Sequence, residues 1–596
     1  MTFNEQKQKK LFTRRSIILG GCKIALVGLL IGKMFHLQIL GHKKFSELAE
    51  KNRVKTKLIP PLRGRILDRN DKALALNEQN YQLVFEKLAN STEENNYKIL
   101  IRIIEILKLS TNQQKEIIDQ SKEMEIDDEL IVISNLSWSQ VMDIELNIYD
   151  LPGVYVKLGF SRLYPYEETF GHLTGYIGTI SNKDKLKNST FLYPALKVGK
   201  NGIEKTQENI LSGKSGSRKI EVNAKGEEIR EISISNSISG ENIQLTIDAD
   251  LQRKANELLS DNTGVILVAK IKTGEILASV SKPSFNPNLF NQGIYTEELN
   301  KLIHNHELPL IDRTVALTYP PGSVFKINVA IAALKQKFSP DTRFFCPGYY
   351  ILGERKFKCW NKFGHGSINL YEAIAGSCNV YLWHVARIIG IQPFADTARL
   401  LGYDQKLLNG VLPREQNGII PDPEWKKNKI GAKWTLADTI NSAIGQGYVE
   451  ATPIQILTMI SRIASGKKFV PSIIKTDNKV FEPIGLDREA AIVKKGMEMT
   501  VNSQVGTAYL YRIIEKELFM AGKTGTCQVI SKRHENDDLS KANVVKKIKN
   551  HGMFVAYAPI YNPEYSFCGI IEHGGTPSLA VKIAKELLQE SQLRKI

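Results

Sequence analysis

A polar, basic segment followed by a long apolar run opens the chain. Residues 16–40 are mainly apolar and exceed the roughly 20 residues that a membrane-spanning helix needs. Lys23 and Lys33 interrupt the run, and each lies near enough to one end for its amine to reach the polar interface. The pattern therefore predicts one N-terminal transmembrane helix over residues 16–40.

Short strand and helix patterns alternate over residues 41–239. Residues 43–53 predict a helical stalk, and residues 63–69 predict an extended segment that enters a turn at residues 70–71. The stretch from 90 to 150 is rich in charge and has apolar residues at helical spacing. None of these elements carries an evident set of catalytic residues, so we predict a mixed, non-catalytic domain here.

A different arrangement begins near residue 240. Helical patterns, among them 324–334 and 370–389, fill the middle of this part, and a last helix is expected from residue 578. Two strand patterns precede this insert and three follow it: 264–270, 275–280, 518–530, 552–558 and 565–572. This order predicts one antiparallel sheet with helices packed against it, an α+β domain over residues 240–596.

Composition places the chain among globular proteins. It has 42% hydrophobic and 24% charged residues, which excludes a collagen-like or disordered chain. The formal net charge of +17 suits nucleic acid, an anionic membrane surface or a polyanionic wall. The sequence has no zinc-finger spacing, no Walker loop and no basic helix with interleaved aromatics, so no nucleic-acid partner is expected.

The charges before the apolar run predict its orientation. Residues 1–15 hold five lysines and arginines against Glu5 alone, so the positive-inside rule places them in the cytoplasm and the chain after residue 40 outside. A cleaved signal peptide is less favoured, because no small-x-small site follows the apolar run. Arg14 and Arg15 also fit twin-arginine export, the weaker interpretation because the positive-inside rule explains them without it.

Ser323 is the first candidate for covalent chemistry. It follows a Tyr-Pro-Pro-Gly turn, and the apolar run behind it predicts a helix that begins at about Ser323. A spacing of three places the Lys326 amine one turn along, on the same face as the Ser323 hydroxyl. A desolvated lysine can take the serine proton, and the helix N-terminus offers N–H groups to an oxyanion. Other Ser-x-x-Lys matches, at 279, 465 and 472, lack this context.

A second polar motif lies 51 residues beyond Lys326, where Ser377 and Asn379 flank one residue. In a loop, the first and third side chains of such a triplet point the same way. A hydroxyl and an amide placed together can relay a proton and hold a substrate amide. The motif has little weight by itself.

A third motif lies in an apolar run with the character of an edge strand. Its glycine lets a substrate backbone approach the strand, and its lysine and last threonine can bind a carboxylate. The residues are Lys523, Thr524, Gly525 and Thr526. The same Lys-Thr-Gly triplet at 272–274 lies in a predicted hairpin turn, and we interpret that copy as structural.

The order of these three motifs, each in its local context, resembles the active-site signature of penicillin-recognising serine enzymes. Residues 63–69, 272–277 and 319–326 resemble class B penicillin-binding proteins, and the similarity extends over nearly the whole chain. The elongation-specific branch of that class is the most similar. Residues 160–165, 171–176 and 202–204 resemble motifs of the family's pedestal domain.

The resemblance implies the fold and the compartment. It implies a transpeptidase fold over residues 240–596, with an antiparallel sheet flanked by helices and a helical subdomain. Residues 41–239 would be a non-catalytic pedestal of the dimerisation type that docks partners. We interpret the arginines of residues 63–69 as members of buried ion pairs that hold this pedestal together. The whole would be a single-pass protein of the bacterial inner membrane, with its catalytic domain in the periplasm.

The resemblance also implies a reaction. Ser323, deprotonated by Lys326, would attack the D-Ala-D-Ala carbonyl of a peptidoglycan stem peptide, and an amine of a neighbouring stem would resolve the ester. The N–H groups of Ser323 and Thr526 would form the oxyanion hole. The leaving-group proton and the substrate carboxylate would be managed by Ser377, Asn379 and Lys523. β-Lactams would acylate the same serine, which links the protein to antibiotic resistance.

The same serine chemistry allows other functions than transpeptidation, and the domain content indicates partners. In a D,D-carboxypeptidase or β-lactamase, water would resolve the ester, but the large N-terminal module and the anchor argue against a secreted lactamase. A β-lactam sensor would need several membrane spans, and a silent scaffold would lack one of the three motifs. Because no glycosyltransferase domain precedes residue 240, a polytopic glycosyltransferase and other elongation-complex proteins are the expected partners.

Three cysteines and a histidine form a further candidate site. Cys346, Cys359, His365 and Cys378 have the spacing C-x12-C-x5-H-x12-C. Residues 349–358 predict a hairpin that would bring Cys346 and Cys359 together at its open end. Three thiolates and one imidazole would make a closed, structural zinc site. A disulfide between Cys346 and Cys359 is the alternative on an oxidising side of the membrane, and His365 would then be an ordinary loop residue.

The resemblance favours zinc, because elongation-type relatives carry a zinc site at this place. Their cysteine and histidine ligands correspond to Cys378 and His365, whereas Cys346 and Cys359 stand where those relatives have two carboxylates. Two sulfur ligands in place of two carboxylate oxygens make the donor set softer, in the sense of ligand polarisability. The metal would hold the loop of residues 377–379. The remaining cysteines after the anchor, Cys527 and Cys568, are expected to be small core residues.

Overall fold

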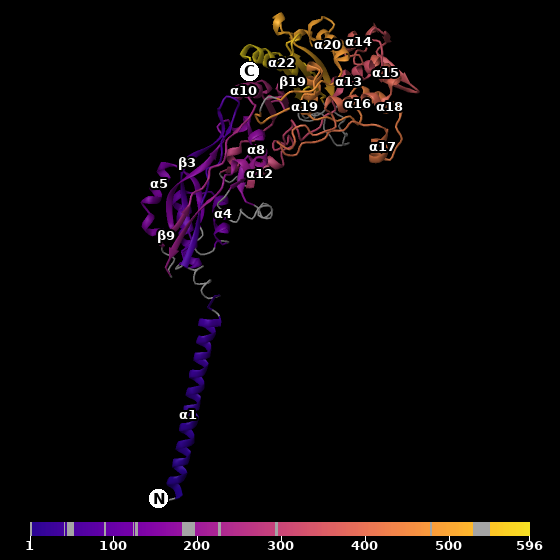
Figure 1. The fold of residues 1–596 in the computed structure, drawn as a ribbon. Helices are drawn as coiled ribbons and strands as arrows, with labels where there is room; N and C mark the ends of the chain where they lie inside the picture. The colour runs from indigo at the N-terminus through magenta and orange to yellow at the C-terminus, as the bar shows by residue number, and fades with distance from the viewer. Residues whose placement is uncertain are drawn as a thin grey trace.

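The computed structural model describes residues 3–40, 42–43, 53–88, 91–122, 124, 129–180, 197–223, 228–291, 296–476, 479–527 and 549–596. Helix α1 (Phe3–Phe35) and the π-helical turn η1 (His36–Leu40) stand apart from two folded domains (Figure 1). Among these residues one segment, Ile17–Leu40, is long and apolar enough to cross a membrane. The predicted apolar helix is confirmed, and the predicted stalk at 43–53 falls almost entirely outside the described residues.

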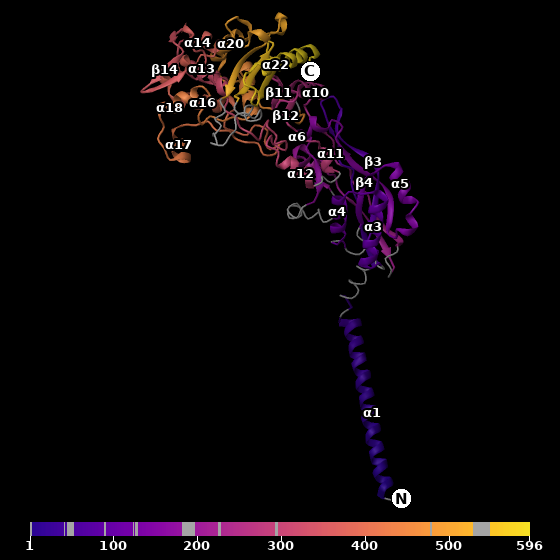
Figure 2. The same cartoon turned by 180° about the vertical axis from the view of Figure 1, so that it is seen from behind.

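The described residues from 53 to 244 form the pedestal, which lies between α1 and the C-terminal domain in both views (Figures 1 and 2). One sheet has the order β10-β2-β3-β4 with β5 also paired to β3, a second has the order β1-β8-β9, and β6 and β7 form a two-stranded sheet. The strands are β1 (Val54–Ile59), β2 (Ile66–Leu67), β3 (Ala73–Glu86), β4 (Glu129–Leu136), β5 (Val154–Leu163), β6 (Ile177–Thr179), β7 (Lys197–Gly199), β8 (Gly216–Val222), β9 (Glu228–Ser235) and β10 (Ile243–Gln244).

Helices cover the first pedestal sheet because their apolar residues recur at helical spacing. In α3 (Glu93–Leu107), Ile99, Ile103 and Leu107 are buried in one cluster with Leu83 and Phe85 of β3. The other pedestal helices are α4 (Thr111–Lys122), α5 (Trp138–Glu145), α6 (Gly171–Thr174), α8 (Gly202–Thr206) and α9 (Glu208–Leu211). The helix-rich character expected for residues 90–150 is thus confirmed.

A buried ion-pair network joins the segment around Arg63 to β5 and α8. Glu204 accepts from Arg63 at 2.6 Å and from Arg162 at 2.7 Å, and the side chains of Arg162 and Glu204 are 1% and 0% exposed. Burial alone would raise the pKa of Glu204, but the two guanidinium groups lower it below its ordinary value. The predicted buried ion pair is found for Arg63, whereas Arg65 of the same segment is exposed.

The C-terminal domain is built on one antiparallel sheet with the order β12-β11-β19-β18-β17. Its strands are β11 (Gly264–Lys270), β12 (Ile276–Lys282), β17 (Ala521–Cys527), β18 (His551–Ala558) and β19 (Tyr565–Ile571). The prediction of two early and three late strands is confirmed, and β17 lies at the edge. Gly274, at φ +80°, forms the turn between β11 and β12, so the second Lys-Thr-Gly triplet is structural.

Alternating side chains divide this sheet into two packed faces. On β11, Val265 and Leu267 belong to the large core that includes the helical subdomain. Ile266 and Val268 point the other way, into a second core against α10 (Ala249–Leu259) and α22 (Ser578–Arg594). This period of two places the sheet between helical layers, as Figures 1 and 2 show.

The helical subdomain lies between β12 and β17 in the sequence. Its helices are α11 (Pro287–Asn291), α12 (Thr296–Ile303), α13 (Lys326–Lys335), α14 (Leu370–Ala375), α15 (Asn379–Ile389), α16 (Ile391–Leu401), α17 (Pro423–Ile430), α18 (Leu436–Ala443), α19 (Pro453–Ser465) and α20 (Asp487–Asn502). Short strands β13 (Phe344–Cys346), β14 (Tyr349–Leu352), β15 (Arg355–Lys358) and β16 (Gly366–Ile368) form two small sheets.

Two details differ from the expected elements. The helical run at 370–389 is two helices, α14 and α15, because Ser377 adopts a left-handed φ of 55° that no continuous helix allows. The strand-like run after residue 240 contributes β10, which pairs in parallel with β2 of the pedestal. The pedestal sheet therefore includes residues beyond 240.

Candidate functional site

The segment that carries Ser323 is a tight turn held from two sides. Ser323 lies in the 3-10 turn η4 (Gly322–Val324), and α13 begins only at Lys326. The helix thus begins later than the apolar pattern predicts, because Phe325 N–H bonds to Gly322 at 3.0 Å and tightens the first turn. Gly322 N–H in turn donates to Gly445 at 2.9 Å.

Gly322 and Gly445 are in van der Waals contact, which leaves no room for a side chain between them. Gly322 has a φ of +53° and Gly445 a φ of +66°. A Cβ on Gly445 would lie 2.3 Å from the Gly322 carbonyl oxygen. The place of the Ser323 turn therefore depends on two glycines far apart in the sequence.

The Lys326 amine is fully buried and bonded to the second motif. It donates to the Ser377 carbonyl oxygen at 2.7 Å, to Asn379 Oδ1 at 2.6 Å and to Ser377 Oγ at 3.3 Å. In the described part of the chain its hydrogen bonds thus reach the second motif rather than Ser323. Burial lowers the pKa of Lys326 to about 8, although the sulfurs of Cys378, Cys359 and Cys346 act in the opposite direction.

The second motif lies in the break between α14 and α15. Cys378 is the N-cap of α15 and accepts from Tyr381 N–H at 3.5 Å through its sulfur. The Trp360 indole donates to the carbonyl oxygens of Gly376 and Ser377 at 3.0 and 3.1 Å. Because the helix breaks here, the side chains of Ser377 and Asn379 both point toward Lys326. The sequence predicted that these two side chains point the same way.

The third motif forms the edge strand β17 beside the turn of Ser323. Lys523 is fully buried, and burial together with the charge of Lys326 lowers its pKa well below the ordinary value. A Cβ on Gly322 would lie 2.8 Å from the Thr526 carbonyl oxygen. That carbonyl therefore points away from β18, and the N–H of the same residue points the same way, toward the turn of Ser323. Gly525 lies close to Val324, because a Cβ added to Gly525 would lie 3.0 Å from Val324 Cγ2.

The structure thus brings every predicted catalytic residue to one place. Ser323 and Lys326 come from η4 and α13, Ser377 and Asn379 from the α14–α15 break, and Lys523 from β17. A hydroxyl nucleophile, an amine of lowered pKa and outward N–H groups are the components of acyl transfer through a covalent serine ester. Their catalytic roles are developed under the proposed function.

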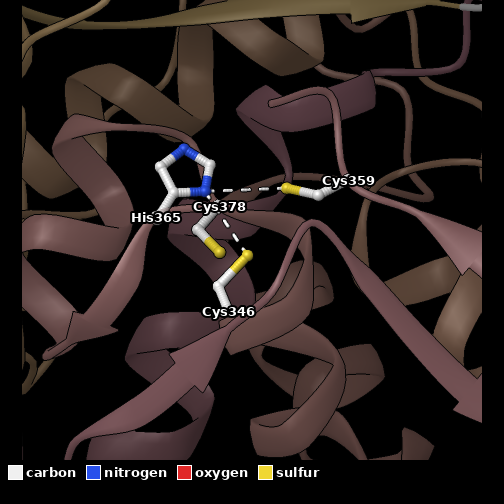
Figure 3. Close-up of side chains that lie close together, drawn as sticks. All are labelled: Cys346, Cys359, His365 and Cys378. Atoms are coloured by element: carbon white, nitrogen blue, oxygen red, sulfur yellow. Dashed lines mark hydrogen bonds between the residues drawn. The ribbon is translucent and has the colours of Figure 1, made fainter. Parts of the chain in front are cut away.

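Three cysteines and a histidine converge behind the second motif (Figure 3). Their ligand atoms all lie within 4.8 Å of one another. The hairpin of β14 and β15 forms as predicted and brings its two flanking cysteines together. The residues are Cys346 at the end of β13, Cys359 after β15, His365 before β16, and Cys378.

Two distances between the imidazole and the sulfurs of this cluster fit a bound zinc ion. His365 Nδ1 lies 3.5 Å from Cys346 Sγ and 3.7 Å from Cys359 Sγ. Bonds of about 2.3 Å to sulfur and 2.0 Å to nitrogen set such atoms roughly 3.6 Å apart. His365 Nε2 lies 3.2 Å from the Gly376 carbonyl oxygen, which favours the tautomer with a free Nδ1. All three cysteines are free thiols rather than a disulfide.

The thiols of the cluster also interact with one another. A hydrogen bond between Cys359 and Cys378 lowers the pKa of Cys359 and raises that of Cys378. One sulfur of the pair thus carries negative charge readily. Soft, anionic sulfur with one imidazole is the donor set that zinc prefers.

Comparison with known proteins assigns the two domains. Residues 264–589 match the model of the penicillin binding protein transpeptidase domain, and residues 58–245 match that of the penicillin-binding protein dimerisation domain. The chain belongs to the penicillin-binding proteins. A peptidoglycan D,D-transpeptidase MrdA of Haemophilus influenzae is 32% identical, over 98% of this chain and 93% of its own length. The predicted family and α+β transpeptidase fold are therefore confirmed.

Solved structures give the same result and identify the branch of the family. Penicillin-binding protein 2 of Helicobacter pylori, in complex with MreC, is 27% identical with a TM-score of 0.81, over 91% of this chain and 100% of that chain. A structure titled as a peptidoglycan synthase complex that coordinates polymerization and crosslinking matches with 27% identity and a TM-score of 0.70, over 96% and 97% of the two chains. The predicted likeness to penicillin-binding protein 2 is confirmed.

Some residues of this penicillin-binding protein site were not predicted from its sequence. Thr507 Oγ1 lies 2.6 Å from Thr524 Oγ1 of the third motif. Gly445 holds the nucleophile turn, and Trp360 holds the second motif. The two glycines at 445 and 447 were a visible turn signal, but nothing in the local pattern of Thr507 or Trp360 indicated a partner.

Proposed function

We propose that the chain cross-links peptidoglycan stem peptides as a D,D-transpeptidase of cell elongation, through an acyl-enzyme on Ser323. The observation that carries the proposal is the fully buried Lys326 amine, of pKa about 8, bonded to the second motif and lying next to the nucleophile in the chain. Such an amine loses its proton near neutral pH and can act as a base. The name of the MrdA relative supports the same reaction.

The first half of the reaction forms the ester. Lys326 takes the Ser323 proton, and Ser323 Oγ attacks the carbonyl carbon of the D-Ala-D-Ala bond. The N–H groups of Ser323 and Thr526 stabilise the oxyanion. When the intermediate collapses, the C–N bond breaks, and Ser377 passes the proton held by Lys326 to the departing amine of D-alanine. Asn379 holds the substrate amide.

The second half regenerates the serine. An amine of a neighbouring stem attacks the ester carbonyl and loses a proton to the same base. The ester C–O bond then breaks, the base returns the proton to Ser323 Oγ, and the new peptide bond is complete. The substrate carboxylate lies against Lys523 and the hydroxyls of β17. A β-lactam has a carboxylate and a reactive amide in a similar arrangement, and its ester on Ser323 is hydrolysed slowly.

The anchor determines on which side of the membrane the reaction takes place, and the anchor and pedestal bind partner proteins. The basic residues before Ile17–Leu40 favour a cytoplasmic N-terminus, with both folded domains on the periplasmic side of the inner membrane. Solved complexes of similar proteins contain MreC, or both polymerising and crosslinking activities. We therefore include elongation-complex proteins and a polytopic glycosyltransferase among the partners of the pedestal and anchor.

We also propose that Cys346, Cys359, His365 and Cys378 hold a structural zinc ion. The donor set and its spacing support this. Because Cys378 lies between Ser377 and Asn379, an ion bound there would restrict the second motif and with it the Lys326 hydrogen bonds. Zinc in a site with four protein ligands supplies no open position for substrate, so its contribution is to stability.

One experiment separates the enzyme from its rivals. The full chain in detergent is incubated with a penicillin, and its intact mass is followed, alongside Ser323→Ala and the matched variant Ser377→Ala. A lasting adduct on the parent and on Ser377→Ala at a reduced rate, absent from Ser323→Ala, supports the proposal. Folded parent without an adduct would overturn it in favour of a scaffold, and rapid turnover of the drug would indicate a β-lactamase.

A further inference from the structure

A hydroxyl outside the three motifs contacts one of the substrate-binding threonines. Thr507 Oγ1 lies 2.6 Å from Thr524 Oγ1. Thr524 belongs to β17 and is 5% exposed, whereas Thr507 is exposed at the rim of the site. The pair therefore joins a solvent-facing loop to the strand that receives the substrate.

The position of Thr507 is set by its two neighbours and by its own backbone. Gly506 occupies a space without room for a side chain, since a Cβ there would lie 2.2 Å from the Thr500 carbonyl oxygen. Ala508 is buried and donates its N–H to Thr500 at 3.0 Å. The N–H of Thr507 reaches the Ala375 carbonyl oxygen at 3.4 Å. The loop thus lies between β17 and the end of α14.

The chemistry of the ligand decides which hydroxyl of the pair donates. A hydroxyl has one proton and two lone pairs, and a carboxylate only accepts. If Thr524 donated to Thr507, it would present lone pairs to the carboxylate. If Thr507 donates to Thr524, the proton of Thr524 is free for the carboxylate, and the two bonds in series strengthen each other.

We propose that Thr507 is a positioning residue for recognition of the substrate's terminal carboxylate. Its hydroxyl donates to Thr524 Oγ1 and directs the Thr524 proton into the site. This inference rests on the proposed function, because it assigns Thr524 to the carboxylate of a D-alanine terminus or of a β-lactam. Thr507 itself takes no part in the proton transfers of Ser323 and Lys326.

The test compares a ligand that has a negatively charged carboxylate with its uncharged ester. Second-order acylation constants of the full chain in detergent are measured by intact mass with benzylpenicillin and with its methyl ester. Thr507→Val, which keeps the shape and removes the hydroxyl, is expected to lower the constant for the free acid about threefold to tenfold. The constant for the ester should stay unchanged. Thr507→Ser retains the hydroxyl and should keep the parent's preference for the acid.

Two controls make the result specific. Ser503→Ala removes a hydroxyl from the same loop and should alter neither constant. In a Thr524→Val background, Thr507→Val should have no further effect, because the bond it removes is already gone. An equal loss for acid and ester, or no loss for either, would overturn the inference and leave the proposed function intact. Failure of the parent to react with both ligands would overturn the proposed function itself.

Discussion

The Lys326 amine donates a 2.6 Å hydrogen bond to Oδ1 of Asn379, which ties the first residue of α13 to the first residue of α15. Because Asn379 follows Cys378 directly, this bond also connects the nucleophile helix to the cysteine cluster. Buried polar bonds of this kind are strong where water is excluded. Lys326, the second motif and the candidate metal site therefore form one connected unit.

Acylation is expected to increase with pH. Burial lowers the pKa of Lys326 to about 8, and only the neutral amine can take the Ser323 proton. Below this pKa the neutral fraction, and with it the rate, should rise about tenfold per pH unit, and the rate should level off above it. Penicillin acylation followed by mass from pH 6 to 9.5 measures the profile. A rate independent of pH would show that Lys326 is not the base, and Lys326→Arg, which keeps its proton, should be inactive.

Zinc is expected in the purified protein at one ion per chain. The zinc ion would hold three cysteines and a histidine together. Removing it with a chelator should therefore lower the melting temperature and loosen residues 377–379. Elemental analysis, thiol titration and differential scanning calorimetry measure these effects. Cys378→Ser should lose the metal, whereas Cys22→Ser, in α1, should retain it. Metal-free protein with a Cys346–Cys359 disulfide, found by non-reducing mass spectrometry, would contradict the assignment.

Substitution at Gly445 is expected to disturb the nucleophile without touching substrate. A Cβ there would lie 2.3 Å from the Gly322 carbonyl oxygen, so Gly445→Ala must displace the turn of Ser323. A shift of about 1 Å can lower the rate about 100-fold. Gly431→Ala is the matched control, because Gly431 also has a positive φ, +75°, but nothing within 4 Å of the added atom. Equal acylation rates in both variants would contradict the role of Gly445 in placing the turn of Ser323.

Loss of charge at Glu204 is expected to destabilise the pedestal. Glu204→Gln would leave Arg63 and Arg162 buried without their full counter-charge. Breaking a buried ion pair in this way costs roughly 3–5 kcal/mol of unfolding free energy. Urea unfolding of the full chain measures it, with Glu94→Gln, in an exposed pair with Lys98, as a control that should change little. A Glu204→Gln curve that overlays the parent's would contradict this account.

The elements of the fold were predictable wherever the local pattern was strong. The strands around residue 272 follow from two short apolar runs on either side of a Lys-Thr-Gly turn. The Ser-x-Asn motif suggested a loop at Ser377, whereas the apolar spacing predicted one continuous helix, because the spacing of α14 continues in phase into α15. Ser377 is held in its left-handed conformation by the hydrogen bonds of Lys326 and Trp360 to its carbonyl oxygen and by its own N–H, which donates to Ile374.

The sequence by itself determined the local geometry and the order of the motifs. A spacing of three residues already implies one helix face, and alternation already implies the two faces of a strand, because these periods come from the backbone alone. The tertiary structure decided which motifs meet. Lys326 and Ser377 are 51 residues apart, and Thr507 and Thr524 are 17 apart. Their contacts depend on the order of strands in the sheet and on the packing of whole helices, which no local period records.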